Sequence, residues 1–411
     1  MCASPPSTAI SAKPRISKTS SRPWAARPIN PGRSQMASSA DLSFMRTALG
    51  LAARGLGRVW PNPAVGCVLV DAQGRVVGRG WTQPGGRPHA EREALDRAGA
   101  AARGATAYVT LEPCSHHGKT PPCADALIDA GVVRVVAALG DPDPRVSGRG
   151  FAQLRAAGVV VETGLLVDEA RALNLGFLLH RLRGRPLVTL KAATTLDGRI
   201  ATAGGDSQWI TGPQARRYGH LLRADHDAIA IGLGTALADD PLLSCRLAGL
   251  EDRSPLRVVF DSALALPLGG ALVRSADRLP LWIITTAAAT AARRQALVER
   301  GAEILEVEAD PRGRPTIAGA LSALAGQGVT RLLVEGGGHL AAAFLAADLV
   351  DRLAWFRAAR LIGGDGLAAV AALGIDRLAD SVQFSLEACQ TLGDDRLELY
   401  ARSRDPLSPA P

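Results

Sequence analysis

The chain has 411 residues, of which 47% are hydrophobic and 21% charged, a balance typical of a folded protein of about two domains rather than a disordered one. No apolar run is long enough to span a bilayer, and an aromatic content of 4% argues against a single-strand nucleic-acid binder that stacks bases. Six cysteines in so long a chain make no disulfide framework, so we expect a cytoplasmic protein.

The net charge of +8 is concentrated at the N-terminal end. Residues 1–35 hold six Lys or Arg, and no Asp or Glu precedes Asp41, so the rest of the chain is close to neutral. We expect residues 1–38 to be a disordered leader rich in Ser, Pro and Arg, without the apolar region of a secretory signal. Two interpretations stay open: an organellar transit peptide, or a gene-model extension before a true start at Met36. We favour the second.

From Asp41 onward the pattern is that of an α/β protein. Apolar residues recur at helical spacing between Leu42 and Leu51. Strands and helices then alternate, which predicts a mostly parallel sheet with helices on its faces. The basic segment 180–185 is the expected linker, so the first domain would cover residues 39–183. We expect strands at 64–70, 76–81, 105–111, 132–139 and 159–162, and helices at 89–99, 122–131, 151–158 and 167–182.

The α/β pattern restarts after the linker and predicts a second domain over residues 186–403. The last two of its strands, 353–361 and 396–401, would close the sheet. The other strands are expected at 187–193, 228–231, 257–261, 281–285, 304–307 and 331–334, and helices at 213–224, 291–301, 317–325 and 339–349.

The first half carries a candidate metal site. His89 begins a predicted helix with Glu91 two residues later, and Cys114 and Cys123 follow the next strand. One imidazole and two thiolates suit a catalytic Zn²⁺ whose fourth position is open for water. Zinc lowers the pKa of such a water to about 7, and Glu91 can shuttle its proton without being a ligand. A His-x-Glu followed by Pro-Cys is typical of zinc deaminases of nucleobases.

Two alternatives and one departure from the usual spacing are weighed against this assignment. Cys114 and Cys123 could be ordinary core thiols, as we expect for Cys67 in the strand VGCVLV. Nucleobase deaminases usually have Cys-x-x-Cys, whereas eight residues separate the two cysteines here. The insert contains His116, His117 and Lys119, so either histidine could replace a cysteine as ligand.

The first half resembles the deaminase half of the bifunctional riboflavin-biosynthesis deaminase/reductases. The resemblance rests on PNPAVGCVLV (61–70), PHAE (88–91) and ATAYVTLEPCSHHGKTPPC (105–123), with the long insert between the cysteines. It implies a cytidine-deaminase-like three-layer α/β domain in which His89, Cys114 and Cys123 bind zinc and Glu91 is the proton donor. Asn62 would be a pyrimidine contact, although a Pro-Asn-Pro turn alone also explains it.

The second half shows no metal cluster in its sequence. Gly336, Gly337 and Gly338 end an apolar strand and open a helix, where free N–H groups could hold a pyrophosphate. A plain strand–helix turn would need glycine too.

Taken with KAATTLDGRIA (191–201), SQWIT (207–211), LRAD (222–225) and GTALADDPLLSCR (234–246), the second half resembles the reductase half of the same family. That resemblance implies a dihydrofolate-reductase-like α/β domain that uses NADPH. Lys191 and Asp197 would lie near the nicotinamide, without an assigned role. The cofactor positions would be Ala193, Trp209, Thr235, Asp239, Ser262 and Gly337, and the substrate positions Ser207, Arg223, Leu243, Arg246 and Glu335.

The arginines also make sense by themselves, because guanidinium binds phosphate bidentately. The alternative for Arg223 is a solvated charge on a helix face.

We therefore expect a bifunctional hydrolase and oxidoreductase. By the resemblance, it deaminates 2,5-diamino-6-(5-phosphoribosylamino)pyrimidin-4(3H)-one and then reduces the phosphoribosyl group of 5-amino-6-(5-phosphoribosylamino)uracil. Small phosphoribosyl pyrimidines are the expected partners, with no nucleic acid and no membrane, and a homo-oligomer stays open. A nucleic-acid deaminase would predict Cys-x-x-Cys and a basic folded part, and an inactive scaffold would predict a lost ligand or a lost Glu91. Neither is seen.

Overall fold

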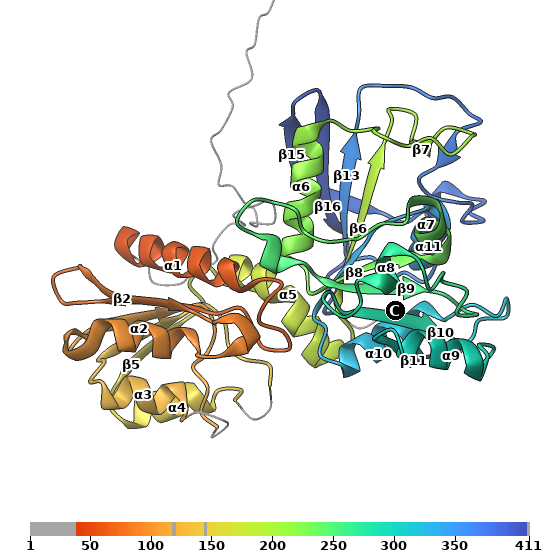
Figure 1. Ribbon diagram of the computed structural model, residues 1–411. Coiled ribbons are helices and arrows are strands. Elements are labelled where there is room, and N and C mark those ends of the chain that lie inside the picture. Colours follow the sequence, from red (N-terminus) through yellow and green to blue (C-terminus); the bar gives the residue numbers. More distant parts are fainter. Residues whose placement is uncertain (1–37, 117–120, 144–145, 409–411) are drawn as a thin grey trace, which may run out of the picture.

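The computed structural model describes residues 38–116, 121–143 and 146–408, which form two α/β domains lying side by side (Figure 1). The predictions for the leader before Ser38, for Met36, and for His117 and Lys119 lie outside the described residues. Among these residues, no helix combines the length and the apolar character that crossing a membrane requires.

The first domain is a sheet between two layers of helices, with strand order β2–β1–β3–β4–β5. β3, β4 and β5 are parallel, as expected, but β1 is antiparallel to both β2 and β3. The expectation of a mostly parallel sheet is wrong for this edge, because the turn at 71–75 is too short for the crossover that parallel strands need. The strands are β1 (Gly66–Val70), β2 (Val76–Trp81), β3 (Thr106–Val109), β4 (Arg134–Ala137) and β5 (Val160–Thr163).

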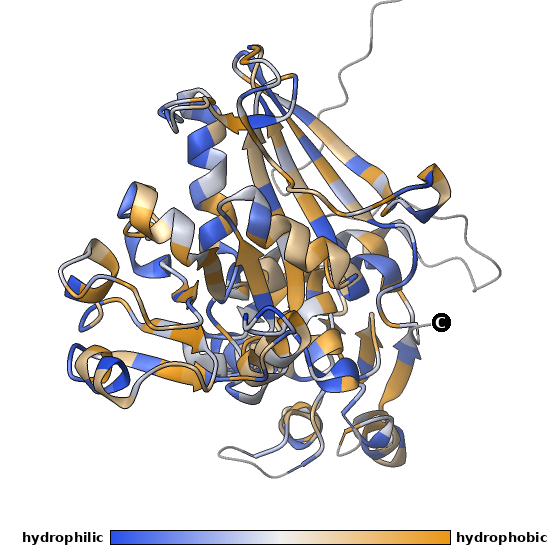
Figure 2. Cartoon of the chain, turned by 90° about the vertical axis from the view of Figure 1, so that its right-hand side faces the viewer, coloured by the Kyte–Doolittle hydropathy of each residue, from blue (hydrophilic) through white to orange (hydrophobic). Residues whose placement is uncertain are grey.

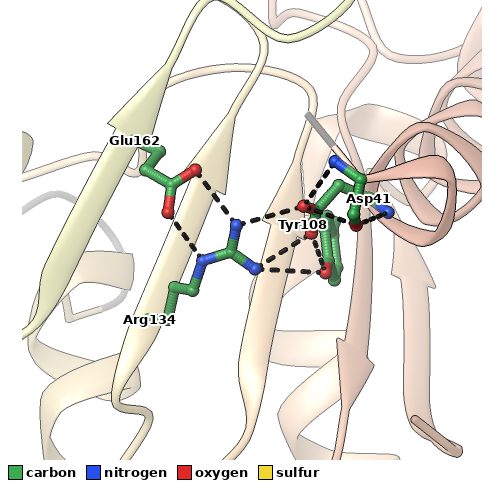
Figure 3. Close-up of polar contacts among 5 residues, drawn as sticks. Asp41, Tyr108, Arg134 and Glu162 are labelled. Carbon is green, nitrogen blue, oxygen red and sulfur yellow. Dashed lines mark hydrogen bonds and ion pairs between the residues drawn. The ribbon is translucent and has the colours of Figure 1, made fainter. Parts of the chain in front are cut away.

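Helices α2 (Ala90–Ala98), α3 (Cys123–Asp129) and α4 (Arg149–Ala156) pack against one face of this sheet, and α1 (Ser39–Ala52) covers the other. A polar network fixes α1 (Figure 3). Ser38 caps the helix and Asp41 completes the capping box. The Asp41 carboxylate also accepts hydrogen bonds from Tyr108 of β3 at 2.5 Å and from Arg134 of β4 at 2.9 Å, and Arg134 pairs with Glu162 of β5 at 2.8 Å. The network ties α1 to three strands.

Helix α5 (Val167–Arg183) connects the domains, and the expected linker 180–185 is partly wrong. The helix continues through Arg183, where basic side chains favour its C-terminal end. It ends at Gly184, whose left-handed φ of 62° suits glycine. On its way α5 contacts the second domain: the Leu173 carbonyl accepts from Arg331, and His180 Nε2 lies 3.0 Å from the Ala325 carbonyl.

The second domain has one large sheet in the order β11–β10–β9–β8–β12–β6–β13–β16–β15. The strands from β11 to β13 are parallel, and β16 and β15 extend the sheet in antiparallel fashion. The strands of this sheet are β6 (Leu187–Thr194), β8 (Ala228–Gly232), β9 (Leu256–Phe260), β10 (Leu281–Thr285), β11 (Ala302–Glu306), β12 (Arg331–Val334), β13 (Arg352–Arg357), β15 (Phe384–Leu392) and β16 (Asp395–Arg402).

Helices cover both faces of this sheet, and two hydrophobic clusters fill the layers between. The inner strands β8, β9 and β10 are buried along almost their whole length, whereas β13 and β16 alternate, as the blue and orange bands of the outer strands in Figure 2 show. The helices are α6 (Pro213–Ala224), α7 (Leu233–Asp239), α8 (Ala271–Arg274), α9 (Ala291–Val298), α10 (Ile317–Gly326) and α11 (Gly338–Ala346).

Several elements were not anticipated from the sequence. α7 and α8 are short helices. β15 lies beyond β16 at the edge of the sheet, whereas the sequence predicts 396–401 as the last strand. The strands β7 (Arg199–Ala201) and β14 (Leu367–Ala368) form a separate small antiparallel ribbon. Short 3₁₀ turns occur at Ala53–Gly55, Pro84–Gly86, Gly99–Ala102, Glu251–Arg253 and Leu378–Asp380.

Candidate functional site

The start of α2 positions a predicted metal ligand, His89, and the predicted catalytic residue, Glu91. His89 is the N-cap residue, in extended conformation, and its Nδ1 faces the two cysteines. Glu91 lies in the first turn and is only 3% exposed. Burial raises the pKa of Glu91 to about 7.

The two predicted cysteine ligands come from the loop after β3 and the first residue of α3. The backbone N–H of Cys123 donates to Cys114 Sγ at 3.3 Å. Hydrogen bonds from Cys123, and from His89, lower the pKa of Cys114, which favours its thiolate form. Cys67 lies apart, fully buried in β1, as expected of a core thiol.

The donor set fits zinc. His89 Nδ1 lies 3.7 Å from Cys114 Sγ and 3.4 Å from Cys123 Sγ, and the three ligand atoms lie within 4.8 Å of one another. Tetrahedral zinc, with Zn–N near 2.0 Å and Zn–S near 2.3 Å, requires N···S separations of about 3.5 Å. The side chains are therefore already arranged at ligand spacing.

A cavity of about 220 Å³ opens beside these residues. Asn62, from the Pro-Asn-Pro turn, lines it as the sequence suggested, together with His89, Glu91 and Cys114. His116 also lines the cavity but is not part of the cluster, so the described residues give no support to His116 as a ligand.

Glu112, two residues before Cys114, is a residue of this site whose role the sequence did not indicate. Its buried carboxylate accepts four backbone N–H groups: Asp141 (3.3 Å) and Gly148 (3.0 Å) at Oε2, and Gly150 (3.0 Å) and Phe151 (3.3 Å) at Oε1. Glu112 thereby joins the cysteine loop to the segment after β4, whose residues Asp141 and Asp143 line the same cavity. Glu112 is part of the Glu-Pro-Cys motif, but the local sequence does not indicate that its carboxylate binds backbone N–H groups 29–39 residues away.

The segment after β4 supplies acidic groups to the cavity that the sequence did not indicate. Asp141 and Asp143 line the cavity, and burial raises the pKa of Asp141 to about 6. Asp143 pairs with Arg181 of α5, which lines the cavity too. The helix that connects the domains therefore contributes a side chain to this cavity.

In the second domain the predicted residues gather at one edge of the sheet. Ala193 lies on β6, Thr235 follows β8, Ser262 follows β9, and Glu335 and Gly337 follow β12. These four strands are parallel, so their carboxyl ends lie together. That edge is where open α/β sheets bind ligands.

A buried charge cluster forms the centre of this edge. Arg223 of α6 donates Nε and Nη2 to the two Glu335 oxygens, each at 3.0 Å, and Nη1 to the Ser244 carbonyl at 3.1 Å. Lys191 Nζ lies 3.6 Å from the same carboxylate. Although burial opposes its ionisation, these cations lower the pKa of Glu335 to about 2. Arg223 is therefore an internal ion-pair partner, not the solvated charge of the alternative.

The glycine turn after β12 lies so close to Thr235 that a side chain at Gly336 would not fit. Gly336 has φ +119°, and a Cβ there would lie 2.8 Å from Thr235 Oγ1. The same hydroxyl accepts the Gly337 N–H at 3.1 Å, and α11 begins at Gly338. The free N–H groups of the first turn of α11 and the carboxyl edge suit an anionic cofactor such as NADPH.

The remaining predicted residues surround this edge less tightly. Trp209 is 57% exposed, with the Arg216 guanidinium 4.7 Å from its ring centroid, and Ser207 lies in the same loop. Asp239 and Arg246 are exposed. Leu243 is buried in the core, so a contact from this residue would involve its backbone.

Asp197 forms hydrogen bonds that hold two loops together. Its carboxylate accepts the N–H of Gly363 at 2.7 Å and of Ile362 at 3.2 Å, and it bonds to Thr195. The Thr195 bond, followed by that from Gly363, lowers the pKa of Asp197 to about 2. Asp197 therefore joins the turn after β6 to the loop after β13.

Two family descriptions match the chain, one in each domain. Residues 38–139 match the cytidine and deoxycytidylate deaminase zinc-binding region, and residues 186–397 match the RibD C-terminal domain. The riboflavin biosynthesis protein RibD of Escherichia coli is 43% identical over 368 residues, covering 86% of this chain and 97% of the relative. RibD of Aquifex aeolicus is 39% identical over 362 residues, covering 88% and 98%.

Solved structures give the same picture. RibD of Acinetobacter baumannii superposes with a TM-score of 0.80 at 37% identity, covering 89% of this chain and 99% of the other. A Thermotoga maritima protein described as a diaminohydroxyphosphoribosylaminopyrimidine deaminase/5-amino-6-(5-phosphoribosylamino)uracil reductase superposes with a TM-score of 0.77 at 34% identity, covering 88% and 99%.

Proposed function

The chain belongs to the family of bifunctional riboflavin-biosynthesis deaminase/reductases, and on that premise we propose which of its residues perform each reaction. The enzyme hydrolyses the exocyclic amine of 2,5-diamino-6-(5-phosphoribosylamino)pyrimidin-4(3H)-one with zinc, and reduces 5-amino-6-(5-phosphoribosylamino)uracil with NADPH to the ribitylamino product.

In the deaminase, His89 (through Nδ1), Cys114 and Cys123 hold the metal. The observation that carries this assignment is the spacing of the three ligand atoms, which agrees with tetrahedral zinc. Bound zinc supplies a Lewis acid that makes water nucleophilic near pH 7. Glu91, buried beside Cys123, takes a proton from the attacking water and delivers it to the leaving amino nitrogen, which departs as ammonia.

In the reductase, residues at the carboxyl edge of the sheet would hold NADPH, which would supply a hydride to C1′ of the ribosyl group. Gly337 and Thr235 shape the turn that would hold the pyrophosphate. The other cofactor contacts are Ala193, Trp209, Asp239 and Ser262.

The substrate contacts of the reductase are Ser207, Arg223, Leu243, Arg246 and Glu335. Three of the Arg223 nitrogen atoms are already engaged by Glu335 and Ser244. We therefore assign the phosphate to the exposed Arg246, with Arg223 and Glu335 forming the floor of the site. We place the enzyme in the cytoplasm, because the described cysteines Cys67, Cys114, Cys123, Cys245 and Cys389 are all free.

Glu91→Gln tests the two-site assignment. The variant keeps the three ligands, so zinc should remain bound, while ammonia release should fall by about 10² to 10⁴ because the proton carrier is lost. Supplied with 5-amino-6-(5-phosphoribosylamino)uracil and NADPH, it should oxidise NADPH at close to the wild-type rate. Loss of both activities with zinc and fold retained would instead require one shared active site.

A further inference from the structure

One turn of α6 holds the segment that carries Arg246. His220 Nδ1 accepts the backbone N–H of Arg246 at 3.3 Å. One turn further along the helix, Arg223 donates to the Ser244 carbonyl at 3.1 Å. Cys245, between them, directs its thiol to the His220 carbonyl at 3.5 Å. The helix therefore contacts each of three consecutive residues of the segment.

The conformation of this segment depends on such contacts. Leu243, at its start, has φ +57°, which a non-glycine residue rarely adopts. On the other side, the Cys245 N–H donates to Ser254 Oγ at 3.0 Å. A backbone held in a sparsely populated conformation persists because its surroundings fix it. Loss of the His220 contact would let the segment move.

The contact requires a neutral imidazole, because a protonated ring has no lone pair on Nδ1. Burial, together with the facing guanidinium groups of Arg223 and Arg246, lowers the pKa of His220 to about 4. Glu335 and the Ser244 carbonyl oppose this shift without overcoming it. The ring is therefore neutral at pH 7 and can act as an acceptor.

We propose that His220 is a positioning residue of the reductase: by holding the Arg246 backbone, it directs the Arg246 guanidinium toward the substrate phosphate. This inference rests on the proposed function, in which Arg246 binds that phosphate. The Arg246 side chain is long and exposed, so the region that its guanidinium can reach is set by where its backbone is held. Arg223 is less available for this contact, since three of its five N–H groups are engaged by Glu335 and Ser244.

Steady-state reduction of 5-amino-6-(5-phosphoribosylamino)uracil tests the proposal. His220→Ala should raise the KM for this substrate about tenfold, the worth of one hydrogen bond, with kcat and the KM for NADPH within about twofold. His220→Asn should restore the KM, because its amide oxygen can occupy the place of Nδ1. His220→Gln should not, because its longer side chain carries the oxygen past that position. Arg217→Ala, an exposed change on the same helix, is the matched control and should leave all constants unchanged.

The double variant separates positioning from other roles. If His220 acts through Arg246, His220→Ala should add almost nothing to the KM of Arg246→Ala. Additive effects, or failure of His220→Asn to restore the KM, would overturn the proposal. If Arg246→Ala raises the KM and His220→Ala does not, only the positioning inference is wrong. If Arg246→Ala leaves the KM unchanged, the phosphate assignment fails and the inference with it. If His220→Ala does not fold, the comparison of His220→Asn with His220→Gln tests the proposal in its place: the KM should be near wild type in the first and raised in the second.

Discussion

The two active sites of this chain are built over very different distances. The deaminase cluster is assembled from residues between His89 and Cys123, at the starts of two neighbouring helices and in one loop. The reductase residues are spread from Ala193 to Gly337 and meet because four parallel strands end at the same edge. A short-range motif can specify a metal site, whereas the second site exists only once the sheet has formed.

The sites also differ in enclosure. Glu91 is 3% exposed and lines a cavity together with His89 and Cys114, whereas Trp209 is 57% exposed and Arg246 is exposed as well. Substitutions in the first site should therefore abolish an activity, and substitutions in the second should weaken binding by degrees.

The largest effect is expected for Cys114→Ser. A hydroxyl is a far poorer zinc ligand than a thiolate, so zinc and deamination should be lost together while NADPH-dependent reduction persists. Zinc content per chain and ammonia release measure this. Cys67→Ala, a buried thiol outside the cluster, is the control and should keep its zinc. Metal loss in the control alone would show that the ligand assignment is wrong.

Glu112→Gln tests how the deaminase cavity is held together. The amide nitrogen would face two of the four N–H donors and leave them unsatisfied, at about 1–3 kcal/mol each. Displacement of the wall that carries Asp141 should lower kcat/KM for deamination about 100-fold, with zinc retained. Asp168→Asn, a surface change in the same domain, serves as control. An unchanged KM and kcat would mean that Glu112 does not position this wall.

Arg246→Ala probes the open site. A charge-assisted contact to phosphate contributes about 1.5–3 kcal/mol, so the reductase KM for the phosphoribosyl substrate should rise roughly ten- to a hundredfold. NADPH affinity should stay nearly the same. Fluorescence titration with NADPH, beside the substrate kinetics, distinguishes the two ligands. An equal loss in both would place this arginine at the cofactor.

The smallest effect on either activity is expected for the network around Asp41, which acts on the stability of the fold (Figure 3). The Arg134 hydrogen bond holds the pKa of Asp41 well below its ordinary value near 4. The Asp41 carboxylate therefore stabilises the fold fully above about pH 4. This contribution is lost as the pH falls toward the pKa that Asp41 has in the folded protein. Asp41→Asn should cost about 1.5–3 kcal/mol at pH 7. Thermal unfolding from pH 7 to pH 3 should show the gap between wild type and variant narrowing at the acid end, and a gap that widens there would contradict this account.

Most of the secondary structure could be predicted because apolar spacing is a local property. The pattern from Leu42 to Leu51 indicated α1, and the apolar runs indicated the inner strands of both sheets. The direction of strands and the edges of the sheets were harder to predict. β1 is antiparallel to β2 because a tight turn joins them, and β15 has no continuous apolar run that would indicate a strand. The basic residues after His180 suggested a linker, but they belong to α5, where their positive charge favours the C-terminal end of the helix.

The sequence by itself determined the chemistry of the first site. His89, Glu91, Cys114 and Cys123 are fixed by spacing, since helix starts and one loop bring them together locally. It also supplied the resemblance from which the reductase residues were named. Only the tertiary structure decided that Glu112 anchors the segment after β4, that Arg223 is committed to Glu335, and that His220 holds Arg246. The physical reason is that backbone N–H groups and carbonyls carry no residue identity, so their long-range partners become visible only when the chain is folded.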